Sequence, residues 1–152
     1  PELKGASTAL IENQVALLNS YGVCLFHWML DPAGYTPQDY YGRAYAAATG
    51  IDRSPEELMR DGERICNLEK AINSRVGMRR EHDTICERWM WEPTDEGMYP
   101  GSVAANVFEE VLDEYYDWRG WERRTGLQTR EKLESLDIGD VADVLEKDGA
   151  LA

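Results

Sequence analysis

Three cysteines and two histidines are the side chains of this 152-residue chain best suited to metal chemistry, and Cys24 has the most informative surroundings. An amphipathic run ends at Gly22, and Cys24 follows within an apolar stretch that extends from Val23 to Leu30. Glycine readily takes the left-handed conformation that closes a helix, so we expect Cys24 to lie just beyond a helix end. Rigid neighbours would hold the thiol there and present it to a group outside its own segment.

The same residue types also allow a Cys2His2 metal site. Cys24 and His27 are three residues apart and His82 and Cys86 are four apart, and metal ligands use both spacings. Nothing in the sequence shows that the two pairs meet, so a second reading stays open, in which His27 is a hydrogen-bonded side chain in an aromatic setting. We expect Cys66 to pack against its neighbours and Cys86 to be inert, since free cysteine is among the most buried residue types.

Charged residues in the middle of the chain resemble a set of catalytic carboxylates. Glu63, Arg64 and Glu69 fall on one long predicted helix, where such groups more often form surface or inter-helix ion pairs, for example of Glu63 with Lys70 or Arg64. Asp83 and Arg88 follow that helix, and we expect them to fix a loop. The charged groups are therefore predicted to be structural.

Aromatic residues gather near the end of a later predicted helix, where they could form a ligand platform: Tyr115, Tyr116, Trp118 and Trp121. The alternative is that Tyr115 belongs to the core, while Trp118 and Trp121 fasten the chain that follows the helix. We favour the alternative, because large aromatic side chains contribute more often to packing than to binding.

Helical spacing of apolar residues predicts the elements that position these groups. Residues 6–19 carry such a pattern. Thr36, followed by proline, supplies the start of a helix that stops at Gly50, and Ser54 with Glu57 forms a capping box for the longest helix. Further helices are expected over 103–120, 129–136 and 141–147, with ordered loops over 78–88 and 89–101.

The longest predicted helix, from Ser54 to about Gly77, carries a heptad-like apolar stripe: Leu58, Ile65, Leu68, Ile72 and Val76. No strand pattern and no internal repeat is visible. The sequence therefore predicts an all-α fold, an irregular multi-helix domain with long ordered loops that residues 1–152 form as a single domain.

The bulk composition is that of a globular domain, with 43% hydrophobic and 30% charged residues. A formal charge of −13 argues against binding to nucleic acid or to anionic membranes. No apolar run is long enough to span a membrane, and no targeting segment is visible. Three well-separated cysteines without a CxxC pair indicate reduced thiols, which predicts a cytoplasmic location. The start at Pro1 predicts that the chain is a piece of a longer protein.

Four stretches carry patterns that are weak singly but specific in their order and spacing. Residues 19–24 read Asn-Ser-Tyr-Gly-Val-Cys, and residues 62–73 read Gly-Glu-Arg-Ile-Cys-Asn-Leu-Glu-Lys-Ala-Ile-Asn. Asp83, Ile85, Cys86 and Arg88 lie in a third stretch, and residues 115–121 read Tyr-Tyr-Asp-Trp-Arg-Gly-Trp. Together they resemble the C-terminal domain of tungsten-containing aldehyde ferredoxin oxidoreductases. The resemblance covers most of this chain but only the last part of the family's chain.

The resemblance implies a function in a larger enzyme. Members of this family bind a tungsten bis-pterin and one [4Fe–4S] cluster, oxidise small aldehydes to carboxylic acids and pass electrons to ferredoxin. The family's Asp-x-x-Gly-Leu-Cys segment provides the fourth cluster cysteine, which corresponds to Cys24 here, with Asn19 and Val23 beside a pterin. Four thiolates are what such a cluster requires. The other cluster cysteines belong to the remaining domains of the polypeptide, so the isolated chain is expected to bind no cofactor and to be inactive.

Two positions depart from the family pattern. Asn19 stands where the family has aspartate, which keeps a hydrogen-bonding group but adds a donor. Cys86 stands where the family has proline, so the loop has lost a rigid residue.

A second function, from a different class of protein, also stays open: an acidic helical interaction module without a cofactor. An apolar face around Val23 to Leu30 fits both readings.

Overall fold

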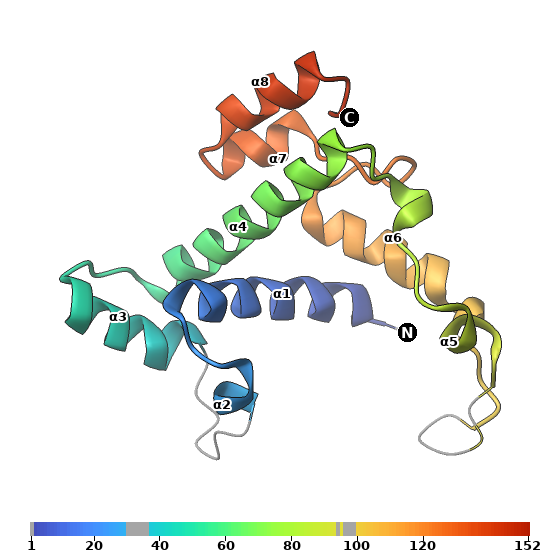
Figure 1. Ribbon diagram of the computed structural model, residues 1–152, viewed down its shortest axis with the longest axis horizontal. Coiled ribbons are helices and arrows are strands. Elements are labelled where there is room, and N and C mark those ends of the chain that lie inside the picture. The colour runs from blue at the N-terminus through green and yellow to red at the C-terminus, as the bar shows by residue number, and fades with distance from the viewer. Residues whose placement is uncertain (1, 30–36, 94, 96–99) are drawn as a thin grey trace.

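The computed structural model describes residues 2–29, 37–93, 95 and 100–152, and its regular elements in these ranges are all helical (Figure 1). This confirms the predicted all-α fold. Within the described ranges no helix is both long and apolar enough to cross a lipid bilayer. The elements are α1 (Lys4–Tyr21), α2 (Leu25–Met29), the π-helical turn η1 (Pro37–Tyr41), α3 (Gly42–Thr49), α4 (Pro55–Arg75), the 3-10 turn η2 (Arg80–His82), α5 (Glu87–Trp91), the 3-10 turn η3 (Ala104–Asn106), α6 (Phe108–Arg119), α7 (Arg130–Ser135) and α8 (Gly139–Lys147).

Helix α1 packs against both α4 and α6, and each contact is made through a glycine (Figure 1). A Cβ atom on Gly62 of α4 would lie 2.3 Å from the carbonyl oxygen of Asn13 in α1. A Cβ atom on Gly5 of α1 would lie 2.5 Å from the amide nitrogen of Tyr115 in α6. Since no side chain fits at either position, these two glycines set how closely the three helices approach.

The buried guanidinium of Arg119 joins α6 to α1. Arg119 is 1% exposed. Its Nη1 donates to Oδ1 of Asn13 at 2.6 Å, and its Nη2 donates to the carbonyl oxygen of Ala9 at 3.2 Å and to the carboxylate of Glu12 at 2.5 Å. A buried charge destabilises a fold unless it is paired and hydrogen-bonded, so this network fixes one register of α6 on α1.

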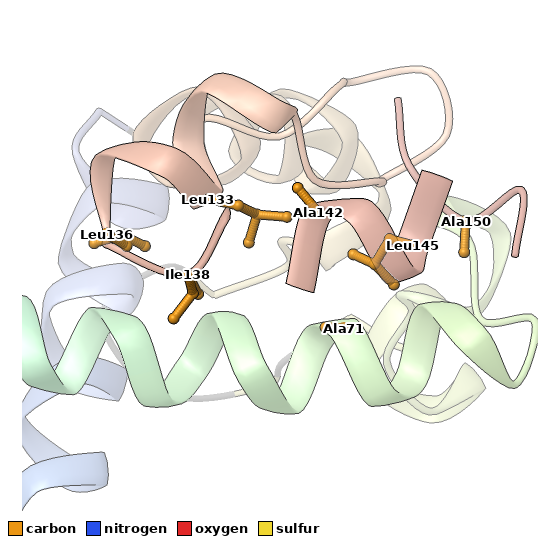
Figure 2. Packing of buried hydrophobic residues seen from close by; sticks show 7 residues of the cluster. All are labelled: Ala71, Leu133, Leu136, Ile138, Ala142, Leu145 and Ala150. Atoms are coloured by element: carbon orange, nitrogen blue, oxygen red, sulfur yellow. The ribbon is translucent and has the colours of Figure 1, made fainter. Parts of the chain in front are cut away.

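A hydrophobic cluster holds the C-terminal helices on α4. Figure 2 shows Ala71 of α4 facing side chains from α7, from α8 and from the segments that follow them. Its buried members are Ala71, Leu133, Leu136, Ile138, Ala142, Leu145 and Ala150. An ion pair of 2.8 Å between Glu63 and Lys132 joins α4 to α7. Glu63 is therefore structural, as expected, but its partner is not Lys70.

The predicted helix boundaries that depend on local chemistry are confirmed. Gly22 and Gly50 follow α1 and α3 with φ angles of 71° and 75°. The Ser54 hydroxyl accepts from the Glu57 amide while the Glu57 carboxylate accepts from the Ser54 amide. Thr129 likewise accepts from the Lys132 amide at the start of α7. The predicted cap at Thr36 lies outside the described residues.

The helix expected over residues 103–120 begins later than predicted. Helix α6 starts at Phe108, and the residues before it form the 3-10 turn η3. Val107 has φ −133°, which is not helical, and its amide donates to the carbonyl of Ala104. Valine, which is β-branched, and asparagine both have low helix propensity, and Asn106 and Val107 stand directly before α6. The apolar spacing that starts at Val103 therefore does not extend the helix.

The apolar stripe predicted along α4 is only partly covered by the rest of the described chain. Leu58 is 3% exposed, whereas Leu68, Ile72 and Val76 are 38%, 64% and 76% exposed. Helices α7 and α8 pack instead on the neighbouring face that carries Ala71. Heptad-like spacing identifies an apolar face but not the element that covers it, and within the described residues this end of the stripe has no cover.

We expect Gly62→Ala to destabilise the fold by about 1–3 kcal/mol, because the new methyl group must push α4 away from α1 at Asn13. Chemical unfolding of the protein carrying this chain measures the change. Gly139→Ala is the matched control, since a Cβ atom there meets only the flexible side chain of Glu134 at 3.4 Å. Equal stability of the two variants would contradict the role given to Gly62.

Candidate functional site

The candidate site begins where α1 ends. The amide of Gly22 donates to the carbonyl of Asn19 at 3.1 Å, and the amide of Val23 donates to the carbonyl of Leu18 at 3.0 Å. These two bonds form a Schellman motif, which ends a helix abruptly and turns the chain away from its axis. Leu18 is fully buried. The turn is therefore anchored in the core, and Cys24 lies just outside the helix, as predicted.

Cys24 is a free and exposed thiol. Its carbonyl accepts from the amide of His27 at 3.0 Å, so the chain continues at once into the short helix α2. Phe26 of α2 is 66% exposed. The structure thus presents a thiol and, two residues later in the sequence, an aromatic side chain on the surface of the described chain.

The Cys2His2 alternative is wrong for this structure. The described residues contain no group of three or more Cys, His, Asp or Glu side chains that could hold a metal ion. His82 instead accepts from the amide of Arg79 at 3.1 Å, and Nδ1 of His27 shares a hydrogen bond of 2.7 Å with the hydroxyl of Tyr41. His27 is therefore the hydrogen-bonded histidine in an aromatic setting that the second reading described.

A cavity of about 690 Å³ lies between α1, α4, α6 and the loop that follows α4. Asn19 lines it from the end of α1, and its exposed side chain belongs to the same turn that presents Cys24. Val15, Phe108 and Val111 contribute apolar wall. The residues of α1 that line the cavity extend from Gly5 to Asn19, five positions before Cys24.

Polar groups on one side of this cavity hold the loop in place. Lys70, 7% exposed, lies 3.2 Å from Asp83 and 4.9 Å from the ring centre of Trp121. The hydroxyl of Tyr116 donates to Asp83 at 2.5 Å. Asp83 therefore fixes the loop as predicted. Arg88 takes no part in this, since it pairs with Glu92 in its own helix at 3.0 Å.

Tyr115 and Cys66 also line the cavity, and both lie beside the Arg119 guanidinium. Burial raises the pKa of Tyr115 above its usual value, so the hydroxyl keeps its proton and donates to Glu12 at 2.7 Å. Burial likewise raises the pKa of the Cys66 thiol, although the nearby Arg119 guanidinium opposes the shift. Cys66 is half-buried and lines the cavity, so it is only partly the packing residue that we expected.

The aromatic residues are arranged only partly as predicted. Tyr116 is the fully buried tyrosine, whereas Tyr115 lines the cavity. Trp118 is 52% exposed, whereas Trp121 is buried and donates to Oδ1 of Asn67 in α4 at 3.0 Å, so Trp121 fastens the chain after the helix as predicted. Tyr115, Tyr116 and Trp118 lie on α6, where the helical period alone could have separated Tyr115 from Tyr116, whereas Trp121 lies beyond the end of the helix.

Comparisons with known proteins agree on one family. Residues 1–138 match the family model described as aldehyde ferredoxin oxidoreductase, domains 2 and 3. The chain is 35% identical over 132 residues to the tungsten-containing aldehyde ferredoxin oxidoreductase of Pyrococcus furiosus and 36% identical over 132 residues to that of Thermococcus kodakarensis. Each match covers 86% of this chain and 20% of the relative, so the chain spans about a fifth of the length of these curated relatives.

A solved structure shares the fold. The active site complex BamBC of benzoyl coenzyme A reductase, determined with 1,5-dienoyl-CoA, superposes with a TM-score of 0.75 at 24% identity. The match covers all of this chain and 22% of that one. At this identity the likeness concerns the fold alone. It shows the same helical arrangement within a much longer chain.

We expect the three thiols to differ in reactivity when the protein is reduced and metal-free. Cys24 and Cys86 are exposed, and we predict that iodoacetamide modifies them about ten-fold or more faster than Cys66 at pH 7.5. Cys66 is half-buried with a raised pKa, so less of it is thiolate at this pH, and its rate should climb at higher pH. Peptide mapping by mass spectrometry measures the rates, and urea should make them equal. A Cys66 rate equal to that of Cys24 in the folded protein would contradict the assignment.

Proposed function

The chain belongs to the aldehyde ferredoxin oxidoreductase family, and we propose that it forms the C-terminal part of an oxidoreductase that converts aldehydes to carboxylic acids and passes electrons to ferredoxin. The remaining domains of the same polypeptide would complete the enzyme. The family match favours this proposal over a cofactor-free interaction module. Inactivity of the isolated chain is part of the proposal, because the chain spans a fifth of its relatives.

The observation that carries the proposal is the exposed thiol of Cys24 at the end of α1. A [4Fe–4S] cluster requires four ligands, usually thiolates, which can come from separate segments. The donor chemistry of Cys24 fits one of these four positions, and its exposure leaves it accessible to a partner. No other cysteine or histidine of the described residues joins it in a metal-binding group, so the remaining ligands would come from elsewhere in the polypeptide.

Asn19 and Val23 are proposed to contact a pterin of a tungsten bis-pterin. Asn19 is exposed and can both donate and accept a hydrogen bond, which is the chemistry that the edge of a pterin ring requires. When bound, the tungsten group would supply the oxidation itself, in which an aldehyde and water give a carboxylic acid, two electrons and two protons. The residues of this chain would bind and orient, and the cavity beside Asn19 would help to shape the approach of the substrate.

The uncovered end of the α4 stripe supports a contact with the rest of the polypeptide. Leu68, Ile72 and Val76 expose apolar surface that is unfavourable in water, and the relatives contain about five times the length of this chain. We place the contact with ferredoxin elsewhere, because a formal charge of −13 would repel an acidic partner. The reduced thiols favour a cytoplasmic location for the enzyme.

We predict that Cys24→Ser in the full polypeptide removes the signal of a [4Fe–4S] cluster from the electron paramagnetic resonance spectrum of the reduced protein. Serine keeps the size of the side chain but lacks the sulfur that binds iron. Cys86→Ser is the matched control, since this cysteine is also exposed but lies before α5. Loss of the signal in Cys24→Ser alone supports the proposal, and an unchanged signal in that variant would sink it.

A further inference from the structure

Helix α2 follows Cys24 directly and is only five residues long. A helix of this length has no stability of its own in water, so its direction must be set by contacts with the rest of the fold. One contact is local, the hydrogen bond from the His27 amide to the Cys24 carbonyl. What fixes α2 therefore also fixes the backbone that bears the Cys24 thiol.

The side chain of His27 supplies a contact with the core. Its Nδ1 lies 2.7 Å from the hydroxyl of Tyr41, and the two rings meet edge to face with centroids 6.1 Å apart. His27 is mostly exposed, whereas Tyr41 is 6% exposed. Tyr41 ends η1, which contacts both α1 and α4. The hydrogen bond thus connects an exposed segment to the helices at the centre of the fold.

We propose that His27 and Tyr41 are positioning residues for Cys24. The turn at Gly22 fixes the chain on the α1 side of the cysteine, and the His27–Tyr41 bond fixes it on the α2 side. Cys24 is then held from both directions, three residues before His27 and two after Gly22. The role toward a cluster rests on the proposed function of Cys24, whereas the restraint on α2 does not.

Tyr41→Phe tests the restraint, because it removes the hydroxyl and keeps the ring that packs in the core. In the full polypeptide without its cofactors, we expect the amides of residues 25–29 to exchange hydrogen about three- to ten-fold faster, the effect of losing one hydrogen bond. Tyr45→Phe is the matched control, a nearby tyrosine whose ring stacks on Tyr21. His27→Phe should give the same increase, and the double variant should add nothing further. Unchanged exchange in Tyr41→Phe would overturn the proposal.

The cofactor-loaded protein tests the role toward the cluster. We expect Tyr41→Phe, but not Tyr45→Phe, to change the reduction potential of the cluster and to speed its loss to a chelator several-fold, while the melting temperature changes little. Faster exchange without any change in potential or cluster loss would overturn the positioning role. A cluster that survives Cys24→Ser would overturn the ligand assignment itself, and the exchange data from the cofactor-free protein would still report on the His27–Tyr41 bond.

Discussion

The contact of α4 with α1 at Gly62 is the constraint on which the rest of the structure depends. A hydrogen atom is all that fits between the Gly62 backbone and the carbonyl of Asn13, so the two helices lie in backbone contact. The same residue, Asn13, accepts from Arg119 of α6, which brings the third helix into register. Glu114 of α6 then accepts from the amides of Leu3 and Gly5 and completes the start of α1, where no side chain of α1 caps the helix. Helix α1 is therefore held along its whole length by side chains and backbone of its neighbours.

The contacts of α4 and α6 with α1 explain why the candidate site lies where it does. Because α1 is fixed along its length, the turn at Gly22 has a fixed position, and so has the backbone of Cys24 two residues later. The cavity lies between the same three helices, and Gly5, at the contact of α1 with α6, is one of the residues that line it. Lys70 and Asp83 hold the loop on its far side. The site is thus built on rigid elements on the α1 side, whereas α2 is linked to η1 through the hydrogen bond and the edge-to-face ring contact of His27 with Tyr41.

The helices could be predicted because they depend on residues close together in the sequence, whereas the tertiary contacts could not be predicted from local patterns. The capping box at Ser54 and the glycine after α1 depend on residues next to one another in the chain, and both were predicted correctly. The fold class followed from helical spacing. The partner of Glu63 is Lys132, 69 positions away, and no local pattern selects it over Lys70. The burial of Tyr116 in place of Tyr115 depends on where Asp83 and Gly126 lie, because the Tyr116 hydroxyl bonds to one and packs against the other. The ligand role of Cys24 stays a prediction drawn from the family pattern.

The exposed apolar residues and the exposed thiol both concern what this chain would contribute to a larger enzyme. Ile72, Val76 and Phe26 expose apolar surface, while the network around Arg119 and the cluster around Leu133 are buried. On the proposed function, the remaining domains of the polypeptide would cover such apolar surface. One thiol cannot hold a cluster of four iron atoms, so on the proposed function the contribution of this chain is positional. It keeps one sulfur atom and one amide side chain, that of Asn19, at fixed places on the end of a clamped helix, and the chemistry would be completed by groups outside it.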